Sequence, residues 1–227
     1  MKKINVLDNG YVSLVDSMGS DLSVVNAARV SFNKEHEVLT EGDEKLIKFL
    51  LEHEHASPFR HAFVTLEVCA PLFVARQWWK HVVGSDHTMD GWNEVSRRYV
   101  SEEPVYYIPE KWRLQAKNKK QGSRGDLPPL ANLTYTTLIE NTYQVGTARY
   151  ESALKDGVAV EQARLFLPAY GMYTSWRWSA SLQSVLHFLE LRKGDEAQWE
   201  IKQYAKAVTS LVEPLFPVTF KVYNDVK

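Results

Sequence analysis

The sequence predicts a single α+β domain over residues 1–227, in which helices flank a largely antiparallel or mixed sheet and form most of a long C-terminal half. Three observations support this prediction. A chain of 227 residues is within the usual size of one domain. It has no internal repeat and no low-complexity linker that would divide it. Alternating apolar patterns lie in its first part, and helical patterns return from about residue 130.

The first elements alternate between strand and helix signals. Apolar residues alternate around Gly10 and Gly19, which predicts a short hairpin or two short strands. We expect Asp21 to cap a first helix and Gly42-Asp43 to open a second one, because short polar side chains satisfy the free N–H groups at a helix start.

Residues 63–69 have an apolar period of two, which predicts a strand with one buried face and one wet or functional face. Pro71 suits the first turn of a following helix, and we expect that helix to continue until Gly84. The predicted buried face of the strand consists of Val64, Leu66 and Val68.

Two later segments lack an apolar period. Residues 83–92 are polar and flanked by glycine, which predicts a loop, and residues 116–129 combine turn formers with mixed charge, which predicts a surface excursion. The last predicted helix has Asp195 as its cap with Gln198 three residues on. Helical patterns cover residues 130–154, 173–191 and 196–215.

The composition is that of an ordinary soluble globular protein. Hydrophobic residues make up 44% and charged residues 24%, and the formal net charge of -1 gives no overall attraction to nucleic acid or membrane. No stretch reaches the roughly 18 apolar residues of a membrane span, and no apolar run follows the N-terminal lysine pair. We therefore expect a cytoplasmic protein whose anion sites are local. One cysteine cannot form an internal disulfide.

The densest group of chemically active residues lies at 76–81 and continues at 93–99. On a helix, Gln77, Lys80 and His81 would present an amide, a cation and an imidazole on one face, which suits a phosphate or pyrophosphate. The alternative is a solvated charged helix with its tryptophans in the core.

The continuation of this group adds groups that bind anions. Ser96, Arg97 and Arg98 supply a hydroxyl and two guanidinium groups, whose fork geometry favours bidentate anion binding. Glu94 is able to accept hydrogen bonds from a ribose or a ring N–H.

Two further groups have simpler alternatives. The histidines at 55–61 with Glu52 and Glu54 could form a metal site, but no known ligand spacing is present, and we predict no metal. Arg164 precedes the predicted helix over residues 173–191, for which ordinary packing with surface arginines is the alternative interpretation. That region carries Trp176, Arg177, Trp178, Gln183, His187 and Arg192.

Ordered sequence blocks give these groups a family resemblance. ARLFLPAYGMYTSWRWSASLQSVLHFLELRKGDEAQWEIKQYA is similar to the C-terminal half of flavin-dependent thymidylate synthases, in which A-R-x-x-L-P precedes a helix ending in L-R and then A-x-x-E-I. Upstream, VVNAARVSF, HASPFRHAFVTLEVCAPLFVARQWWKH and NEVSRRY resemble further family blocks in the same order. The resemblance thus spans nearly the whole chain.

The sequence departs from the family's signature, which is R-H-R, seven residues and a serine. The triplet is Lys80-His81-Val82, and thirteen residues separate Val82 from Ser96. Lys80 replaces the first arginine and lacks its planar guanidinium fork, and Val82 replaces the second arginine and has no charge. The extra residues enlarge the loop at 83–92. The lost phosphate affinity is expected to come from backbone N–H groups or from Arg60, Arg76 or Arg177.

The resemblance implies an activity and a set of ligands. The enzyme would methylate dUMP to dTMP, with 5,10-methylenetetrahydrofolate as one-carbon donor, bound FAD as hydride source and NADPH as reductant. It would be a homotetramer with active sites shared between subunits. Arg192 would lie near the uracil edge and favour the ring anion formed by loss of the N3 proton.

The resemblance also implies which residues bind each ligand. The residues implied to bind dUMP are Gln77, Lys80, Glu94, Val95, Ser96, Arg97, Arg98, Arg164 and Arg192. The residues implied to line FAD are Ser57, Lys80, His81, Val82, Glu94, Ser181, Gln183 and His187.

Covalent catalysis by the protein is not expected. No base near Ser96 is evident from the sequence, so we expect it to donate or accept a hydrogen bond rather than attack the substrate. Cys69 ends a predicted strand without a basic neighbour in sequence to lower its pKa.

Two rival functions remain open. A nucleic-acid-binding module could use stacking and phosphate-binding side chains, although the net charge near zero counts against it. Its residues would be Trp78, Trp79, Lys80, Arg97 and Arg98. The altered triplet also leaves open a flavoprotein with another methyl acceptor, or an inactive regulatory protein.

Overall fold

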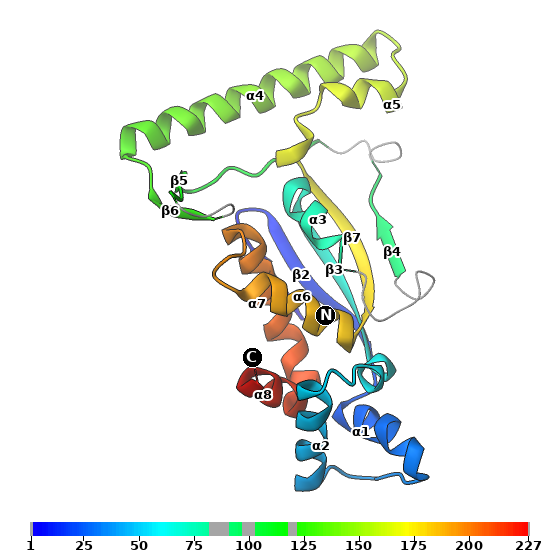
Figure 1. Cartoon of the computed structure of the whole chain (residues 1–227). Coiled ribbons are helices and arrows are strands. Elements are labelled where there is room, and N and C mark those ends of the chain that lie inside the picture. Colours follow the sequence, from blue (N-terminus) through cyan, green and yellow to red (C-terminus); the bar gives the residue numbers. More distant parts are fainter. Residues whose placement is uncertain (1, 82–90, 97–102, 118–121, 227) are drawn as a thin grey trace.

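The computed structural model describes residues 2–81, 91–96, 103–117 and 122–226. Its centre is a five-stranded sheet in the order β1-β2-β3-β7-β4, and every neighbouring pair in it is antiparallel (Figure 1). The predicted α+β class is therefore confirmed. The strands of this sheet are β1 (Lys3–Val6), β2 (Gly10–Met18), β3 (Phe63–Pro71), β4 (Gly91–Glu94) and β7 (Tyr173–Ser181).

Helices cover one face and both ends of the sheet. α3, α6 and α7 pack over one face, α4 lies across one end, and α1, α2 and α8 lie at the other end (Figure 1). The α-helices are α1 (Asp21–Arg29), α2 (Glu41–Glu52), α3 (Leu72–Trp78), α4 (Pro129–Lys155), α5 (Val160–Ala163), α6 (Leu182–Lys193), α7 (Trp199–Val212) and α8 (Pro217–Val226). Short 3-10 turns cover Val30–Phe32, Ser57–His61, Arg164–Phe166, Ala169–Gly171 and Glu213–Leu215.

The core lies between the sheet and α3, α6 and α7. Trp78 stacks on Phe188 with ring centroids 4.3 Å apart, and Trp176 and Trp178 meet its edges at 5.6 Å. All four side chains are buried. This aromatic cluster fixes the start of the segment after α3, where several predicted site residues lie.

β3 has the two different faces that its sequence predicts. Val64, Leu66 and Val68 are buried, and the alternate residues are partly exposed. On the outer face, Glu67 accepts a hydrogen bond from Tyr11 at 2.8 Å and pairs with Arg177 at 3.6 Å. The prediction of one wet face is confirmed.

The predicted helix over residues 173–191 is wrong in its first half. Residues Tyr173–Ser181 form β7, which pairs with the full length of β3. Trp176, Trp178 and Ala180 are buried and alternate with more exposed residues, which is the period of a strand. α6 begins only at Leu182. Burial of alternating large rings against the helices favours the strand here.

Predicted helix starts are displaced by one to three residues. Ser20 and Thr40 have the extended backbone of N-caps, so Asp21 and Asp43 lie inside their helices. The carboxylate of Asp21 instead accepts from the backbone N–H groups of Val218 and Thr219, both at 2.9 Å. This contact joins the starts of α1 and α8.

Two other boundaries differ from the prediction. α7 has Gln198 at its N-cap, and Asp195 instead pairs with Lys202 at 2.7 Å. α3 ends at Trp78 rather than continuing toward Gly84. The predicted loop at 83–92 lies outside the described residues except for its last two, which belong to β4.

The predicted surface excursion contains regular structure in its described part, and its residues 118–121 lie outside the described residues. β5 (Arg113–Gln115) and β6 (Ser123–Asp126) form a second, two-stranded antiparallel sheet. β6 is fully exposed, which explains why no apolar period marks it in the sequence. This small sheet places Arg113 beside the start of α7, where it contacts Glu200.

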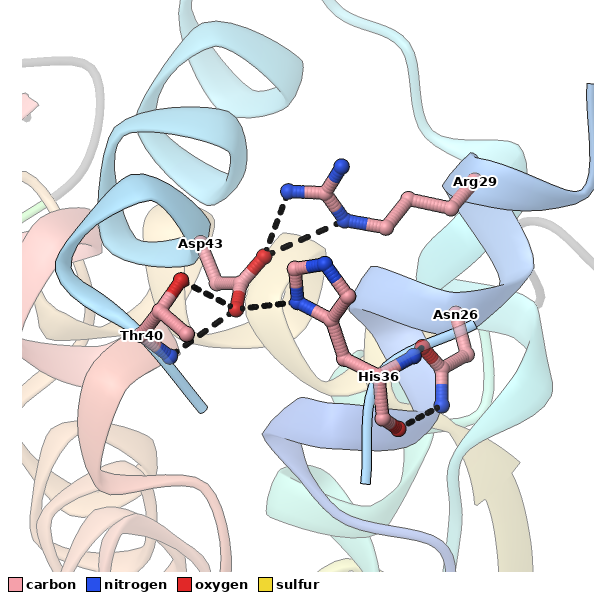
Figure 2. A network of polar contacts seen from close by, with 5 residues as sticks. All are labelled: Asn26, Arg29, His36, Thr40 and Asp43. Atoms are coloured by element: carbon pink, nitrogen blue, oxygen red, sulfur yellow. Dashed lines mark hydrogen bonds and ion pairs between the residues drawn. The ribbon is translucent and has the colours of Figure 1, made fainter. Parts of the chain in front are cut away.

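A buried carboxylate holds the end of α1 against the start of α2 (Figure 2). Asp43 accepts hydrogen bonds from Arg29 at 2.7 Å and from the Thr40 hydroxyl at 2.8 Å, and its other close partner is His36 Nδ1 at 2.9 Å. Burial alone would raise the pKa of Asp43, but these hydrogen bonds outweigh burial and hold the pKa well below its ordinary value.

Among the described residues, no helix is long and apolar enough to cross a membrane.

Candidate active site

Most of the predicted site residues that the structure describes line three separate cavities, and Ser57, His81 and Ser181 line none of them. We call them the cationic cavity, of about 620 Å³, the strand cavity, of about 980 Å³, and the α6 cavity, of about 300 Å³. Among described residues, no side chain lines more than one of the three. Val82, Arg97 and Arg98 lie outside the described residues.

The cationic cavity lies between the end of α3, the end of α6 and the second sheet. Its residues are Arg76, Gln77, Lys80, Arg113, Gly122, Ser123, Arg192, Gln198 and Trp199. Four of these carry a positive charge, and no aspartate or glutamate is among the described residues that line it. Such a cavity favours a ligand with more than one negative charge.

The proposed helical face of Gln77, Lys80 and His81 does not form, because α3 ends at Trp78. Gln77 and Lys80 still reach the same cavity. His81 instead turns inward and is only 4% exposed. A backbone hydrogen bond from His81 N–H to Trp78 C=O at 2.9 Å closes this turn.

His81 holds Arg192 at the edge of the cationic cavity. Arg192 Nε donates a hydrogen bond to His81 Nε2 at 3.0 Å. Burial, Arg192 and His187 all lower the pKa of His81, to about 4. The imidazole is therefore neutral near pH 7, and with Nε2 accepting, its proton is on Nδ1.

The proton on His81 Nδ1 has no acceptor among the described residues, although the atom is buried. A buried donor without a partner is costly, and ligands commonly satisfy such groups at functional sites. His187 lies nearby, with its ring centroid 5.6 Å from that of His81. His187 lines the α6 cavity and His81 contacts Arg192 of the cationic cavity, so the pair links residues of these two cavities.

The strand cavity contains the other half of the predicted dUMP residues. Glu94, Val95, Ser96 and Arg164 all line it. The segment after β4 is held to β7, since Glu94 accepts from the Thr174 hydroxyl at 2.8 Å and Val95 N–H donates to Ser175 C=O at 2.8 Å.

Cys69 also lines the strand cavity. Burial raises the pKa of its thiol, so the thiolate is disfavoured at neutral pH. The thiol lies 3.9 Å from Asn9 C=O. These surroundings do not activate a nucleophile.

Gln183 and His187 line the α6 cavity, one helical turn apart. Gln183 accepts a hydrogen bond from Arg60 Nε at 2.7 Å. Ser181 is fully buried, and its hydroxyl caps α6 by accepting from Ser184 N–H at 3.2 Å. Ser57 begins the 3-10 turn that leads into β3.

The three candidate replacements for the lost phosphate cation lie in different places. Arg177 is paired with Glu67, and Arg60 with Gln183. Arg76 lines the cationic cavity together with Lys80. Arg76 is therefore the candidate whose position best suits an anion.

The histidines near residue 55 are held by local contacts. His53 stacks on Phe49 at 4.1 Å, and its Nδ1 lies 2.9 Å from Phe49 C=O. Within the described part of the chain, no group of three or more His, Cys, Asp or Glu residues could hold a metal ion.

Four residues of the cationic cavity and its wall were not among the predicted site residues, although Gln198, Trp199 and Glu200 lie in the A-x-x-E-I block. Arg113 and Trp199 contact each other, with the guanidinium 5.2 Å from a tryptophan ring centroid. Gln198 and Glu200 lie behind them and connect to Gln77. These residues are distant from the signature in sequence, and only the tertiary structure brings them together.

Comparisons with known proteins identify the family of the chain. The family model described as thymidylate synthase complementing protein matches residues 13–218. A flavin-dependent thymidylate synthase from Thermus thermophilus is 40% identical over 222 residues, which cover 98% of this chain and 78% of that protein. The corresponding protein of Thermotoga neapolitana is 39% identical over 221 residues, covering 97% of this chain and 94% of its own.

A solved structure is similar over the same length. It is the crystal structure of a UMP/dUMP methylase, PolB, from Streptomyces cacaoi bound with 5-Br dUMP. The two chains superimpose with a TM-score of 0.84 and 30% sequence identity, covering 98% of this chain and 97% of the other. The fold, the ordered sequence blocks and these matches show that the chain belongs to the thymidylate synthase complementing protein family.

Proposed function

We propose that the chain is a flavin-dependent thymidylate synthase, which methylates C5 of dUMP to give dTMP. The one-carbon unit would come from 5,10-methylenetetrahydrofolate. The observation that carries the proposal is the cationic cavity, where Arg192 is held by a neutral His81 beside Lys80 and Arg76. The names of the relatives, and the nucleotide bound to the similar structure, support the same reaction.

The residues present fit FAD and a nucleotide monophosphate. The pyrophosphate of FAD and the phosphate of dUMP are both multiply charged anions, and four cations line the cationic cavity. The buried Nδ1–H of His81 offers a donor to a ligand acceptor. When bound, the flavin supplies the hydride that completes the methyl group, and NADPH restores it.

Arg192 would make the uracil reactive. A guanidinium at the uracil edge stabilises the ring anion that forms when N3 loses its proton, and this anion has more electron density at C5. Because His81 is neutral, it orients Arg192 without adding a second positive charge. Lys80, Ser96 and Arg164 would hold the phosphate groups.

The active site would be shared between subunits of a homotetramer. Gln77 and Arg192 lie in the cationic cavity, and Ser96 and Arg164 lie in the strand cavity, which has no described residue in common with it. One dUMP contacts both sets if a second subunit brings its strand cavity against the cationic cavity. The exposed apolar face of α4 supports such an assembly, and includes Leu130, Leu133, Leu138 and Val145.

Anaerobic turnover tests the proposal. The purified protein is loaded with FAD and reduced with NADPH, and dUMP and methylenetetrahydrofolate are then added. We expect flavin reoxidation together with formation of dTMP. A protein that binds no flavin, or that reoxidises without producing dTMP, would contradict the proposal.

A second acceptor, UMP, deserves the same assay because the similar Streptomyces structure is a methylase of both UMP and dUMP. Here we expect dUMP to be the preferred acceptor. A higher kcat/KM for UMP would assign the chain to ribonucleotide methylation.

A further inference from the structure

A line of hydrogen bonds connects the core side of α7 to the wall of the cationic cavity. Glu200 is only 3% exposed, and its Oε1 accepts from Arg113 Nη2 at 2.6 Å and from the Tyr107 hydroxyl at 3.4 Å. Its Oε2 accepts from Gln198 Nε2 at 2.8 Å. The Gln198 carbonyl oxygen in turn accepts from Gln77 Nε2.

The carboxylate gives this line a direction. A carboxylate only accepts hydrogen bonds, so Gln198 must turn its NH₂ group toward Glu200 and its oxygen toward Gln77. Gln77 must then turn its own NH₂ group toward Gln198. The carbonyl oxygen of Gln77 is left for the cavity, and it has no hydrogen-bond partner among the described residues.

We propose that Glu200 is a positioning residue that sets, through Gln198, the orientation of the Gln77 amide at the dUMP site. This inference rests on the proposed function, because that function places Gln77 against dUMP. Gln77 would offer an acceptor oxygen to the nucleotide. The partner on the nucleotide is then a hydrogen-bond donor, such as an N–H of the base or a ribose hydroxyl, and not a phosphate oxygen.

The Glu200→Gln substitution is expected to reverse the direction of the hydrogen bonds that run from position 200 through Gln198 to Gln77. Arg113 remains a donor only, so the new amide must turn its oxygen toward Arg113 and its NH₂ group toward Gln198. Gln198 and Gln77 then reverse in turn, and Gln77 offers NH₂ to the cavity instead of oxygen. The side chain keeps its size, so packing around position 200 is preserved.

A second substitution separates orientation from charge. Adding Gln198→Glu to Glu200→Gln places an acceptor-only group directly against Gln77. The orientation of Gln77 is restored, although the carboxylate at position 200 is still missing. A purely structural role for the ion pair between Glu200 and Arg113 predicts no such recovery.

The test measures the dissociation constant of dUMP with FAD-loaded enzyme, from the change in the flavin spectrum. We expect Glu200→Gln to weaken dUMP roughly tenfold, as for the loss of a buried hydrogen bond to a ligand, with FAD affinity unchanged. The double variant is expected to recover most of this loss. Lys202→Gln, at a partly exposed position of α7, is the matched control and should bind dUMP as wild type does.

Unchanged dUMP affinity in Glu200→Gln would overturn the inference, and so would a double variant that binds dUMP as weakly as the single one.

A thermal double-mutant cycle tests the inference without dUMP. Gln77→Glu places a carboxylate against the Gln198 oxygen, and should lower the Tm more in the wild-type background than in the Glu200→Gln background. Equal losses of Tm would also overturn the inference. If wild type binds no dUMP, the proposed function fails, and the thermal cycle still decides the orientation.

Discussion

At His81, three influences act on one imidazole in the same direction. Burial, the guanidinium of Arg192 and the neighbouring His187 each disfavour the protonated ring. The neutral ring accepts from Arg192 and so orients the residue to which we assign activation of the uracil. Protonation would remove this acceptor and place two cations in contact.

The first prediction concerns stability in acid. The folded-state pKa of His81 is about 4 against an ordinary 6.5, so the unfolded chain binds a proton over this window and the folded chain does not. The free energy of unfolding should therefore fall by about 3 kcal/mol as the pH drops from 6.5 to 4 and level off below, from this residue alone.

Urea unfolding of wild type and His81→Gln at several pH values measures this contribution. Glutamine retains an acceptor for Arg192 but does not titrate. The difference in unfolding free energy between the two proteins should change across this window in favour of the variant as the pH falls. A difference that is constant with pH would refute the assigned protonation state.

The second prediction concerns Cys69. Its thiol has a raised pKa and lies at the end of β3, so we expect Cys69→Ala to keep kcat within about threefold of wild type. Steady-state formation of dTMP provides the measurement. Loss of product with flavin still bound would indicate a covalent thiolate mechanism instead.

The sequence proposed site residues within its ordered blocks, but not their environment. Gln77, Lys80 and Arg192, which the resemblance assigns to dUMP, line one cavity. The inward turn of His81 could not be predicted, because it follows from the early end of α3. Arg113 carries no motif, and Glu200 lies in the A-x-x-E-I block without a predicted role, since only their contact in the tertiary structure gives them one.

Among the elements, the strand β3 was predictable because its alternation is regular and its Val, Leu and Val residues all face the core. β7 was not recognised, although Trp176, Trp178 and Ala180 alternate in the same way. The polar residues between them are Ser175, Arg177 and Ser179. In so short a run, these residues fit the period of a helix as well as the period of a strand. The pairing with β3, a long-range contact, decides between strand and helix.

The third prediction concerns the pair α1 and α2. Asp43→Ala removes the acceptor shared by Arg29, His36 and Thr40, and should lower the free energy of unfolding by roughly 3 kcal/mol. Chemical denaturation at neutral pH measures the loss. The matched control is Glu44→Ala, whose exposed pair with Lys221 should contribute much less than the buried network.

Acid provides a further check on Asp43. Its pKa is lowered in the folded state, so its stabilising contribution is present at neutral pH and is lost as the pH falls below the ordinary value of 3.8. The loss in free energy of unfolding caused by Asp43→Ala should therefore become smaller as the pH falls below this value. Equal deficits for both substitutions at neutral pH would mean that the network in Figure 2 contributes no more than a surface pair.

The whole chain leaves one long helix partly uncovered. α4 packs Tyr143 and Gly146 inward, while Leu130, Leu133 and Leu138 remain more than half exposed at 78%, 63% and 54%. Several large apolar side chains on one exposed helix favour a subunit interface. The separate cavities support the same proposal, since one ligand would have to join residues from two of them.

The fourth prediction is that Leu138→Asp dissociates the oligomer. The side chain is exposed in the single chain, so the substitution should change monomer stability by no more than about 0.5 kcal/mol. Sedimentation velocity should show the wild type as a tetramer and the variant as smaller species. Glu140→Gln, on the same helix, is the control, and a variant that sediments as wild type does would exclude this face from the interface.

The fifth prediction joins the two halves of the site. Arg192→Ala and Arg164→Ala each remove a guanidinium from a different cavity, so each variant alone should release little tritium from 5-tritiated dUMP. Mixed oligomers, co-expressed with two affinity tags and purified through both, should regain release, because about a quarter of sites in a random mixture combine two intact halves. Mixed oligomers as inactive as their parents would contradict a site shared between subunits.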